Sequence, residues 1–440
     1  MNTNLIRKSI ICLFVTIMIF FAPKNAFADQ DFGKDAEENL RKIDEEFGMR
    51  IGGTEQHAKM QEWLLETIRS YGYEPEQLAF HDMGLLHDKY YDGVNIKFEK
   101  PGKTDETILI CAHYDCVDTN GAEDNGTGVS VLLELAKRFY NIETKYTIRF
   151  LLFDEEENCL VGSMYYAHHE DLSDVICACN LDCIGVGDDM YVYGEGPYTT
   201  DENTGIQKDW PIMQFAACAN ASGIPIRLHQ YEGSYGFPGG FGMSDHSAFL
   251  SHSIPYVFMA AGYWTEGEAT ELLDTADPSV SEGRIIHNPE YDNLEYIEEH
   301  FGNRIFDHMS KYSEVATYFL QYADPYKSTD DVANEVMAVN GYQPTSESEK
   351  STETESNEST GSESESDSLP ETETKTSEQN SKESSVSESM TESSIEVLDG
   401  DGSVQTNHSS PIIYFVVAGI AILIIFAVFF VIIHFRHHYI

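Results

Sequence analysis

The residues best suited to chemistry follow an apolar stretch in the first third of the chain. Ile108–Cys111 is typical of a buried strand. It is followed by His113, Asp115 and, after a turn that contains glycine, Asp124; the helical pattern of Val129–Tyr140 begins just beyond. Ligand sites of open α/β sheets lie where a strand gives way to the next helix. Imidazole and carboxylate together suit a divalent metal such as zinc, so the stretch predicts a metal site, with a solvated polar loop as the alternative.

Two further predicted strands also end in acidic residues. The strand Thr147–Phe153 is followed by four consecutive acids at positions 154–157, and the strand Val175–Leu181 is followed by Asp182. Adjacent carboxylates repel one another unless a cation lies nearby. Within such a run, one carboxylate can bind a metal while its neighbour accepts a proton. Because three successive strands each deliver an acid at the carboxyl end, we favour one shared site over a set of solvated acidic turns.

Two segments that contain histidine lie later in the chain. Ser244-Asp245-His246 stands in a glycine-rich loop, and Ile286-His287 precedes the last predicted helix. Either histidine could complete a metal site, because imidazole is the commonest metal ligand in proteins. Each one alone would more often be an ordinary surface residue.

The elements that must position these residues alternate between strands and helices. Apolar runs bounded by turn residues predict strands, at residues 94–98, 107–111, 146–153, 175–181, 190–193, 225–229 and 255–260. Helical periodicity predicts helices, at residues 35–47, 55–71, 129–140, 161–169, 211–221 and 294–322, with Thr54 as a cap and Pro211 in a first turn. The alternation predicts an α/β fold, a three-layer αβα sandwich in which helices cover both faces of a mostly parallel central sheet.

Both ends of the chain depart from this pattern. Residues 1–28 are typical of a secretory signal peptide, with basic residues before an apolar run and a small-residue cleavage site ending at Ala28; an uncleaved anchor is the alternative. Ile412–Ile433 is uninterrupted and apolar, and its 22 residues are long enough to cross a bilayer. We assign residues 410–433 to a transmembrane helix and residues 434–440 to a short cytoplasmic tail. The chain would then be a single-pass protein of the cell membrane with its catalytic part outside.

A tract rich in Ser, Thr and Glu, residues 343–409, contains almost no large apolar side chains. Its composition cannot bury enough surface to offset the ordering of the backbone, so we predict a disordered stalk. Residues 29–342 remain as the folded catalytic domain, with 20 basic and 58 acidic residues. Such an excess of negative charge disfavours binding to nucleic acid or to an anionic membrane surface.

Seven cysteines lie in the folded part of the chain. An odd number, mostly within predicted strands, is not typical of a disulfide framework. We therefore expect mostly buried thiols, with at most one or two bridges.

Six short motifs occur in a fixed order: A-H-Y-D at 112–115, G-A-E-D-N-G-T-G at 121–128, E-E-x-x-L-x-G-S at 156–163, N-L-D at 180–182, S-D-H at 244–246 and I-H at 286–287. In this order they resemble the two-zinc exopeptidases, which include secreted bacterial aminopeptidases and enzymes of the glutamate carboxypeptidase II type. The resemblance extends from about Arg50 to Tyr322. It implies a fold of the zinc-exopeptidase type and a zinc-dependent aminopeptidase, which removes N-terminal residues from peptide substrates with water activated by two zinc ions per chain.

The resemblance also implies which residues hold the metal. His113 and Asp182 would be the terminal ligands of one zinc ion. Glu157 and His287 would hold the other, and Asp124 would bridge both ions.

Two more residues take catalytic roles in this resemblance. Glu156 would be the general base, and Asp115 would orient His113 by a hydrogen bond to its second ring nitrogen. A slip of one residue in the alignment of the acidic run would make Glu155 the base instead.

Two positions depart from the family pattern. Members have a tyrosine three residues before the serine of S-D-H, where this chain has Phe241, and the nearest candidate is Tyr235. The acid expected four residues after the final histidine is replaced by Tyr291, and Asp292 follows, which predicts a local insertion near Pro289.

Three other functions are compatible with parts of this pattern. Glutaminyl cyclases share the fold but use a single zinc, and the five retained candidate ligands favour two metals. A carboxypeptidase would need a basic cluster to receive a C-terminal carboxylate. A surface binding ectodomain without activity would have no need for an intact set of ligands and base.

Overall fold

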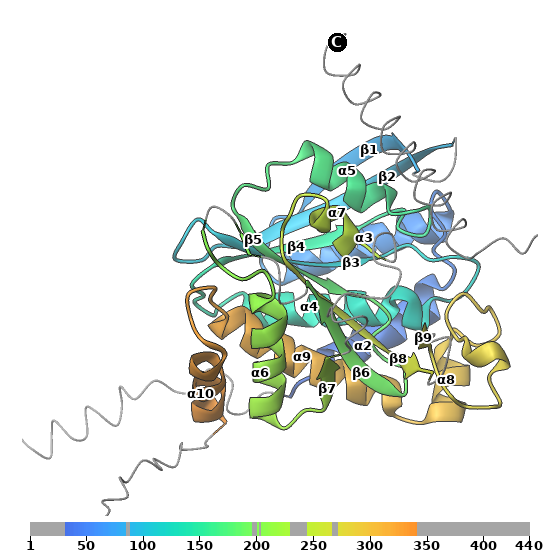
Figure 1. The fold of residues 1–440 in the computed structure, drawn as a ribbon. Helices are drawn as coiled ribbons and strands as arrows, with labels where there is room; N and C mark the ends of the chain where they lie inside the picture. Colours follow the sequence, from blue (N-terminus) through green and yellow to red (C-terminus); the bar gives the residue numbers. More distant parts are fainter. Residues whose placement is uncertain are drawn as a thin grey trace, which may run out of the picture. The chain divides into compact units, whose positions relative to one another are not determined.

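The computed structural model describes residues 31–84, 89–195, 200–201, 204–228, 244–265 and 272–340. All of them belong to one folded unit, a sheet covered by helices (Figure 1). The predicted signal peptide, stalk, transmembrane helix and cytoplasmic tail lie outside the described residues. Of the helices that the structure does describe, none is both long enough and apolar enough to cross a membrane.

The described part of the sheet has nine strands in the order β1-β2-β4-β3-β5-β8-β6-β7, with β9 paired to β8. They are β1 (Glu76–Met83), β2 (Tyr90–Lys100), β3 (Thr107–His113), β4 (Thr147–Phe153), β5 (Val175–Leu181), β6 (Asp189–Gly194), β7 (Ile226–Leu228), β8 (Tyr256–Trp264) and β9 (Leu272–Leu273). The central strands β4, β3, β5 and β8 are parallel. At the margins, β2 pairs antiparallel with both β1 and β4, and β6 pairs antiparallel with β8 and parallel with β7. The α/β fold is thus confirmed, with the parallel arrangement concentrated in the centre.

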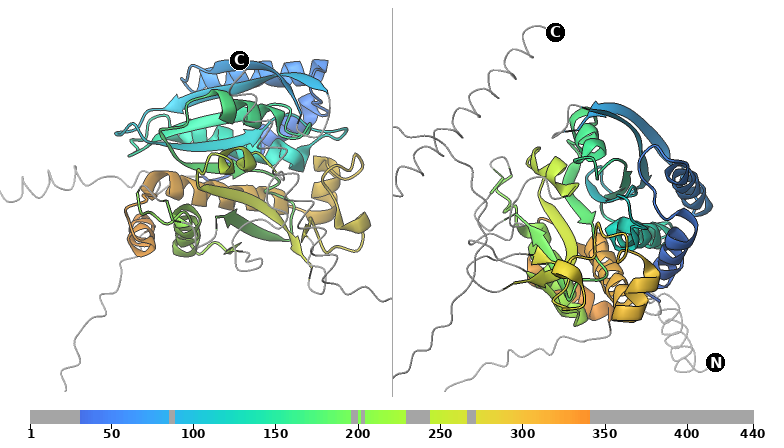
Figure 2. Two further views of the ribbon diagram at one scale, coloured as in Figure 1. Left: turned by 45° about the horizontal axis from the view of Figure 1, so that its top comes forward. Right: turned by 90° about the vertical axis from the view of Figure 1, so that its right-hand side faces the viewer.

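Helices pack on both faces of the sheet (Figure 2). They are α2 (Lys34–Lys42), α3 (Glu55–Ser70), α4 (Thr127–Phe139), α5 (Val161–His169), α6 (Trp210–Ser222), α7 (His246–Leu250), α8 (Leu294–Phe301), α9 (Arg304–Tyr322) and α10 (Thr329–Val339). Short helical turns are η1 (Ile43–Phe47), η2 (Ala122–Gly126) and η3 (Ser281–Gly283). The larger core lies on the face with α2, α3, α4, α6, α9 and α10, and a smaller core lies on the face with α5 and α7.

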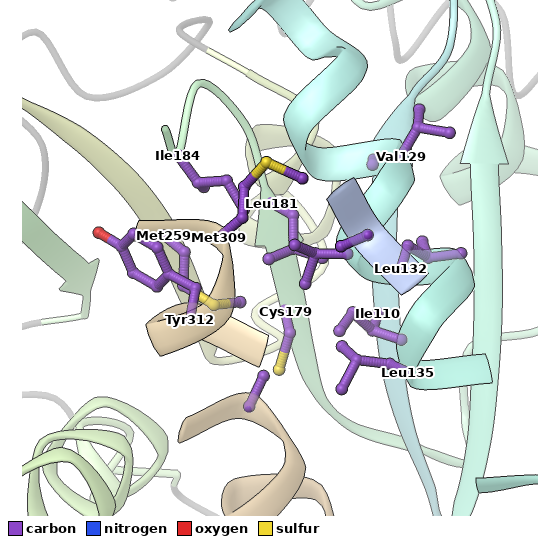
Figure 3. Close-up of a cluster of buried hydrophobic side chains, with 14 of the residues drawn as sticks. Ile110, Val129, Leu132, Leu135, Cys179, Leu181, Ile184, Met259, Met309 and Tyr312 are labelled. Atoms are coloured by element: carbon purple, nitrogen blue, oxygen red, sulfur yellow. The ribbon is translucent and has the colours of Figure 1, made fainter. Parts of the chain in front are cut away.

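Strand β3 takes part in both cores. All of its residues are buried, and successive side chains of a strand point to opposite faces of the sheet. Ile110 therefore joins the larger core together with Leu132 of α4 and Met309 of α9 (Figure 3), whereas Leu109 joins the smaller one. Each such buried side chain contributes about 1.5–3 kcal/mol of transfer free energy. The strand is thereby fixed between two layers, and so is His113 at its end.

Local signals set several boundaries of the helices. Thr54 caps α3 as predicted, because its side-chain oxygen accepts the backbone N–H of His57. Pro211 lies in the first turn of α6, where its missing N–H is not needed. The single helix predicted over 294–322 is instead two helices, because Gly302 ends α8 with a φ of 61° before α9 begins.

All seven cysteines of the described residues are free thiols. Cys159 and Cys183 are partly exposed, and the other five are buried, namely Cys111, Cys116, Cys177, Cys179 and Cys218. The expectation of mostly buried thiols is confirmed. None of the one or two bridges that it allowed is formed among these residues.

Candidate metal centre

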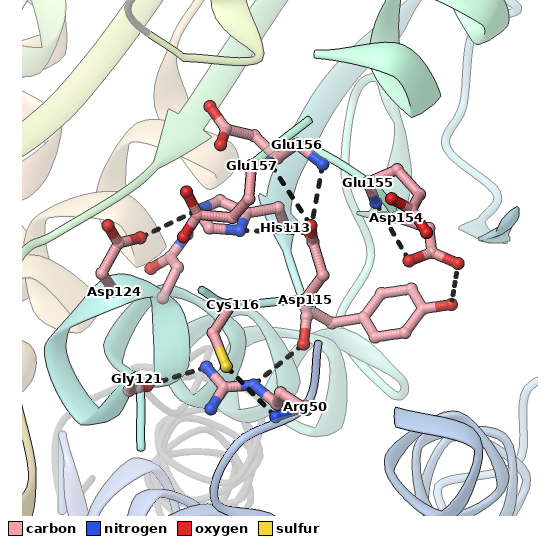
Figure 4. Close-up of polar contacts among 12 residues, drawn as sticks. Arg50, His113, Asp115, Cys116, Gly121, Asp124, Asp154, Glu155, Glu156 and Glu157 are labelled. Carbon is pink, nitrogen blue, oxygen red and sulfur yellow. Dashed lines mark hydrogen bonds and ion pairs between the residues drawn. The ribbon is translucent and has the colours of Figure 1, made fainter. Parts of the chain in front are cut away.

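The carboxyl ends of β3, β4 and β5 meet at one edge of the sheet and bring the predicted site residues together. Figure 4 shows those that follow β3 and β4. His113 is the last residue of β3, Asp182 directly follows β5, and the acidic run 154–157 directly follows β4. Asp124 lies in η2, between β3 and α4, and His287 comes from the loop before α8. The site is therefore built at the edge of the sheet where its three central parallel strands end.

Asp124 lies between the two histidines. Its Oδ1 is 3.1 Å from Nε2 of His113, and its Oδ2 is 3.1 Å from Nε2 of His287. Oδ1 of Asp182 is 3.4 Å from Nε2 of His113, and Oε2 of Glu157 is 3.1 Å from Nε2 of His287. Each histidine is thus paired with one terminal carboxylate, and Asp124 offers one oxygen to each pair.

This group has the properties of a cation site. Oε1 of Glu157 is buried and makes no hydrogen bond among the described residues, which is costly for a polar atom unless an ion or another partner binds it. Ligand atoms of His113, Asp124 and Glu157 lie within 4.8 Å of one another. The same holds for His113, Glu156 and Asp182. Imidazole nitrogens and carboxylate oxygens suit zinc, so the residues present fit a divalent metal.

The acids of the site outnumber its bases. Burial, with a further contribution from Asp124, raises the pKa of Glu157 to about 7, and burial raises the pKa of Glu156 well above its usual range. Burial alone would raise the pKa of Asp124, but the imidazoles of His113 and His287 hold it well below its usual range. Hydrogen bonds to Asp124 and Glu157 raise the pKa of His287 to about 11. A divalent cation in this position would favour the charged form of each carboxylate.

Asp115 holds the acidic run in place. Its Oδ1 accepts the backbone N–H of Glu156 at 3.2 Å, and its Oδ2 accepts the backbone N–H of Glu157 at 3.2 Å. Nδ1 of His113 lies 3.4 Å from Oδ1 of Asp115. Asp115 is therefore adjacent to the histidine that it was predicted to orient. Its contacts with the acidic loop were not predicted from the sequence.

The two candidate bases lie in different surroundings. Glu155 has a φ of 57°, and its carboxylate accepts a hydrogen bond from the side-chain amide of Asn158. Glu156 instead groups with His113 and Asp182. This arrangement favours Glu156 as the base over the slipped alignment.

The side chain of Asp182 is oriented by the S-D-H segment. Ser244 donates its hydroxyl proton to Oδ2 of Asp182 at 2.6 Å. Asn180, two residues before Asp182, donates its amide to Oγ of Ser244 at 2.7 Å. The serine of the motif therefore supports a predicted ligand without being one.

Of the two candidate histidines, only His287 joins the metal group. His246 is buried and stacked on Phe258, with 4.4 Å between the ring centroids. Burial lowers the pKa of His246 to about 3, whereas Nε2 of His287 lies 3.1 Å from a carboxylate oxygen of Asp124 and of Glu157. Phe241 and Tyr235, the positions considered for transition-state stabilisation, lie outside the described residues.

Asp292 ties the loop before α8 to the loop that carries Asp124. It is 0% exposed, and its Oδ1 accepts the backbone N–H of Glu123 at 2.7 Å. Its Oδ2 accepts the hydroxyl of Thr119 at 3.4 Å. Tyr291 is only half-buried, and Asp292 is the residue whose carboxylate reaches η2; the local insertion near Pro289 stays a prediction.

Arg50 supports the same loop from behind and was not predicted from the sequence. Its guanidinium is fully buried and donates hydrogen bonds to backbone carbonyl oxygens (Figure 4), those of Tyr114 at 2.9 Å, Asn120 at 2.6 Å and Gly121 at 2.7 Å. A buried charge needs such partners. These carbonyl groups belong to residues more than sixty positions away in the sequence. The only local signal for this role was therefore an arginine before the turn I-G-G.

Comparison with known proteins gives a family for this arrangement. Residues 95–313 match the sequence model of Peptidase family M28. Alkaline phosphatase isozyme conversion protein of Escherichia coli is 24% identical over 313 residues, which are 65% of this chain and 89% of the relative. Aminopeptidase YwaD of Bacillus subtilis is 38% identical over 96 residues, and this match spans only 21% of each protein.

The fold also has a solved counterpart. The zinc aminopeptidase BSAP from Bacillus subtilis is 16% identical, with a TM-score of 0.50, and the alignment covers 69% of this chain and 98% of that chain. At this identity the likeness concerns the fold. The match to the family begins in β2 and ends in α9, and it includes all seven residues predicted to bind metal or to act in catalysis. The chain therefore belongs to peptidase family M28.

Proposed function

We propose that this M28 peptidase is an aminopeptidase that removes N-terminal residues from peptides with the help of two zinc ions. The observation that carries the proposal is the position of Asp124, which offers one carboxylate oxygen to His113 and the other to His287 at 3.1 Å each. A carboxylate shared in this way between two ligand pairs suits two ions better than one. The relative YwaD is itself named an aminopeptidase.

The donor groups divide into two sets around Asp124. His113 and Asp182 would hold one ion, and Glu157 and His287 would hold the other. When bound, the zinc ions would supply the Lewis acidity that activates water and polarises the scissile carbonyl.

Glu156 is the group that would move the proton. Its carboxylate lies within 4.8 Å of a ring nitrogen of His113 and of the carboxylate of Asp182, and burial raises its pKa, which makes it a stronger base. Because its backbone N–H is held by Asp115, the position of Glu156 relative to His113 is fixed. It would take the proton of the attacking water and deliver it to the leaving amine.

The excess of acids also favours a substrate with a free amino terminus. His287 is about half-exposed, with a side-chain exposure of 55%, whereas the side chain of Asp124 is 8% exposed. The centre is thus reached from solvent on the side of His287, and an ammonium group would be attracted by the carboxylates there. A peptide blocked at its amino terminus would lack this interaction.

We further propose that the catalytic domain faces the outside of the cell and is anchored by residues 410–433. The support is the apolar run together with the signal-like residues 1–28. Cell fractionation should recover the protein with membranes, and an added protease should release the active domain from intact cells. Recovery of the active protein in the soluble cytoplasmic fraction would contradict the proposal.

The activity is tested with the full-length protein in detergent. Leucine anilide should be hydrolysed, an acetylated leucine anilide should not, and a chelator should abolish the activity until zinc is restored. A peptide with N-terminal glutamine is included, because release of ammonia with ring closure would indicate a glutaminyl cyclase. Hydrolysis that persists after complete removal of metal would contradict the proposed mechanism.

A further inference from the structure

We propose that the thiol of Cys183 is an additional ligand of the metal ion held by Asp124 and Asp182. This inference rests on the proposed metal centre and goes beyond the ligand set that the family resemblance implies. The ligand atoms of Asp124, Asp182 and Cys183 lie within 4.8 Å of one another. Sulfur would make this end of the centre chemically different from the end at Glu157.

The distances fit coordination of one ion by adjacent residues. Sγ of Cys183 lies 3.2 Å from Oδ1 of Asp182. Zinc bonds to oxygen and sulfur are about 2.0–2.3 Å long, so two ligands of one tetrahedral ion lie roughly 3–4 Å apart. The sulfur and the carboxylate oxygen therefore have the spacing of neighbouring ligands.

The backbone fixes the direction of the thiol. Cys183 has a φ of 55°, a left-handed conformation that residues with a side chain adopt at a cost and that concentrates at functional sites. Its carbonyl oxygen accepts the backbone N–H of Ala261 in β8 at 2.8 Å. The turn after β5 is thus held against the sheet, and Cys183 is presented beside Asp182.

A second observation points to a ligand at this place. Nε2 of His113 is buried and, apart from its ion pair with Asp124 at 3.1 Å, makes no hydrogen bond among the described residues; it lies 3.4 Å from Oδ1 of Asp182, the oxygen that Sγ of Cys183 approaches. Two carboxylate oxygens and a sulfur within 4.8 Å of one another form a donor set for a divalent metal of borderline or soft character. On binding, the S–H bond breaks, a metal–sulfur bond forms and the proton passes to solvent.

The chain offers a matched control. Cys159 is the other partly exposed cysteine of the described residues. It lies in the loop after β4 and belongs to none of the possible ligand groups. A metal that bound thiols merely because they are exposed would bind Cys159 and Cys183 alike, since both are partly exposed.

The test uses cobalt, because Co²⁺ replaces zinc and reports its ligands by absorption. The full-length protein is loaded with Co²⁺, and its spectrum is compared with those of the variants Cys183→Ser and Cys159→Ser. We expect a near-ultraviolet band of sulfur-to-cobalt charge transfer in the parent and in Cys159→Ser. The band should be lost in Cys183→Ser, while visible ligand-field bands and bound cobalt remain.

Three outcomes are decisive. Ligand-field bands without a charge-transfer band in the parent protein would overturn the role of Cys183 and leave the metal centre intact. Retention of the charge-transfer band in Cys183→Ser would overturn it as well. Failure of the parent to bind cobalt or zinc at all would overturn the metal centre itself, and with it this inference.

Discussion

Single residues of the site differ in function even where they are neighbours in sequence. Glu155 is turned towards Asn158, whereas Glu156 groups with His113. We predict that Glu156→Gln keeps its metal and its fold but loses about 10²–10⁴-fold in kcat, the usual contribution of a general base. Metal analysis and initial rates on leucine anilide check this. Glu155→Gln is the matched control and should keep most of its activity; equal losses in both variants would contradict the assignment.

The two aspartates that follow β3 should also respond differently to truncation. Asp124 shares its oxygens between His113 and His287, so Asp124→Ala should remove ligands from both ion positions at once. Asp115 contacts His113 and two backbone N–H groups of the acidic loop. Asp115→Ala should therefore weaken mainly the ion at His113, by the 10–100-fold typical of groups that orient a ligand. Equilibrium dialysis with zinc measures both, and two intact sites in Asp124→Ala would refute its bridging role.

At the scale of elements, two carboxylates hold the loop before α8, one just after β9 and one that contacts η2. Asp274 accepts the backbone N–H groups of Ile285 at 2.5 Å and Ile286 at 3.0 Å, directly before His287. Asp292, at the far end of the same loop, accepts the N–H of Glu123. The position of His287 therefore depends on anchors on both sides of it.

Asp292 permits a sharp test of this anchoring. Burial, with help from Asp124, raises the pKa of Asp292 to about 8, and Asn in its place keeps an oxygen that can accept the backbone N–H of Glu123. Asp292→Ala leaves the buried N–H of Glu123 without a partner, which should cost about 1–3 kcal/mol in the free energy of unfolding. Urea denaturation should show this loss in Asp292→Ala and little change in Asp292→Asn. A larger loss in the Asn variant would contradict this account.

The contact between α3 and the end of β4 should be sensitive to pH. Burial opposes the charged form of His57, but the carboxylate of Asp154, 2.7 Å away, outweighs it and raises the pKa of His57. The folded state therefore binds this proton more tightly than the unfolded state. Its contribution to stability is complete below the unfolded pKa of about 6.5 and is lost as the pH rises through the raised folded value.

Substitution of His57 isolates that contribution. The difference in the free energy of unfolding between the parent and His57→Gln should be greatest near pH 6 and should fall as the pH rises. His81, which pairs with Asp92 on the surface at 2.8 Å with 63% of its side chain exposed, is the control. His81→Gln should change stability little at any pH. A difference for His57→Gln that grows with pH would refute the assignment.

The central elements were readable from the sequence because each left a local pattern. The parallel strands are largely apolar runs, and three of the five predicted ligands, His113, Glu157 and Asp182, stand at or just after their ends, whereas Asp124 and His287 come from loops. Strand β1 left no such pattern, since among its eight residues only Phe80 is buried. Helix α10 is similar, with Val332 and Val336 as its buried residues. The partners of Arg50 come together only in the folded chain, so no local pattern could have indicated them.

At the scale of the whole molecule, the charge is the dominant feature. Residues 29–342 and residues 343–409, the predicted stalk, are both strongly acidic, and the chain carries a formal net charge of −48. Such a field raises the local concentration of cations and repels anions. If the protein is an aminopeptidase, the residues of a peptide beyond its amino terminus should influence kcat/KM through this field alone.

Two peptides with the same N-terminal leucine test this influence, one followed by two lysines and the other by two glutamates. At low ionic strength the lysine peptide should have the higher kcat/KM, by roughly tenfold or more, because steering by a field of this size changes association rates by 10–10³. Added salt should reduce the ratio towards one, since the Debye length is about 10 Å at 0.1 M and about 3 Å at 1 M. A ratio that does not depend on salt would instead mean that lysine is recognised by direct contact within the site, where screening by salt is weak.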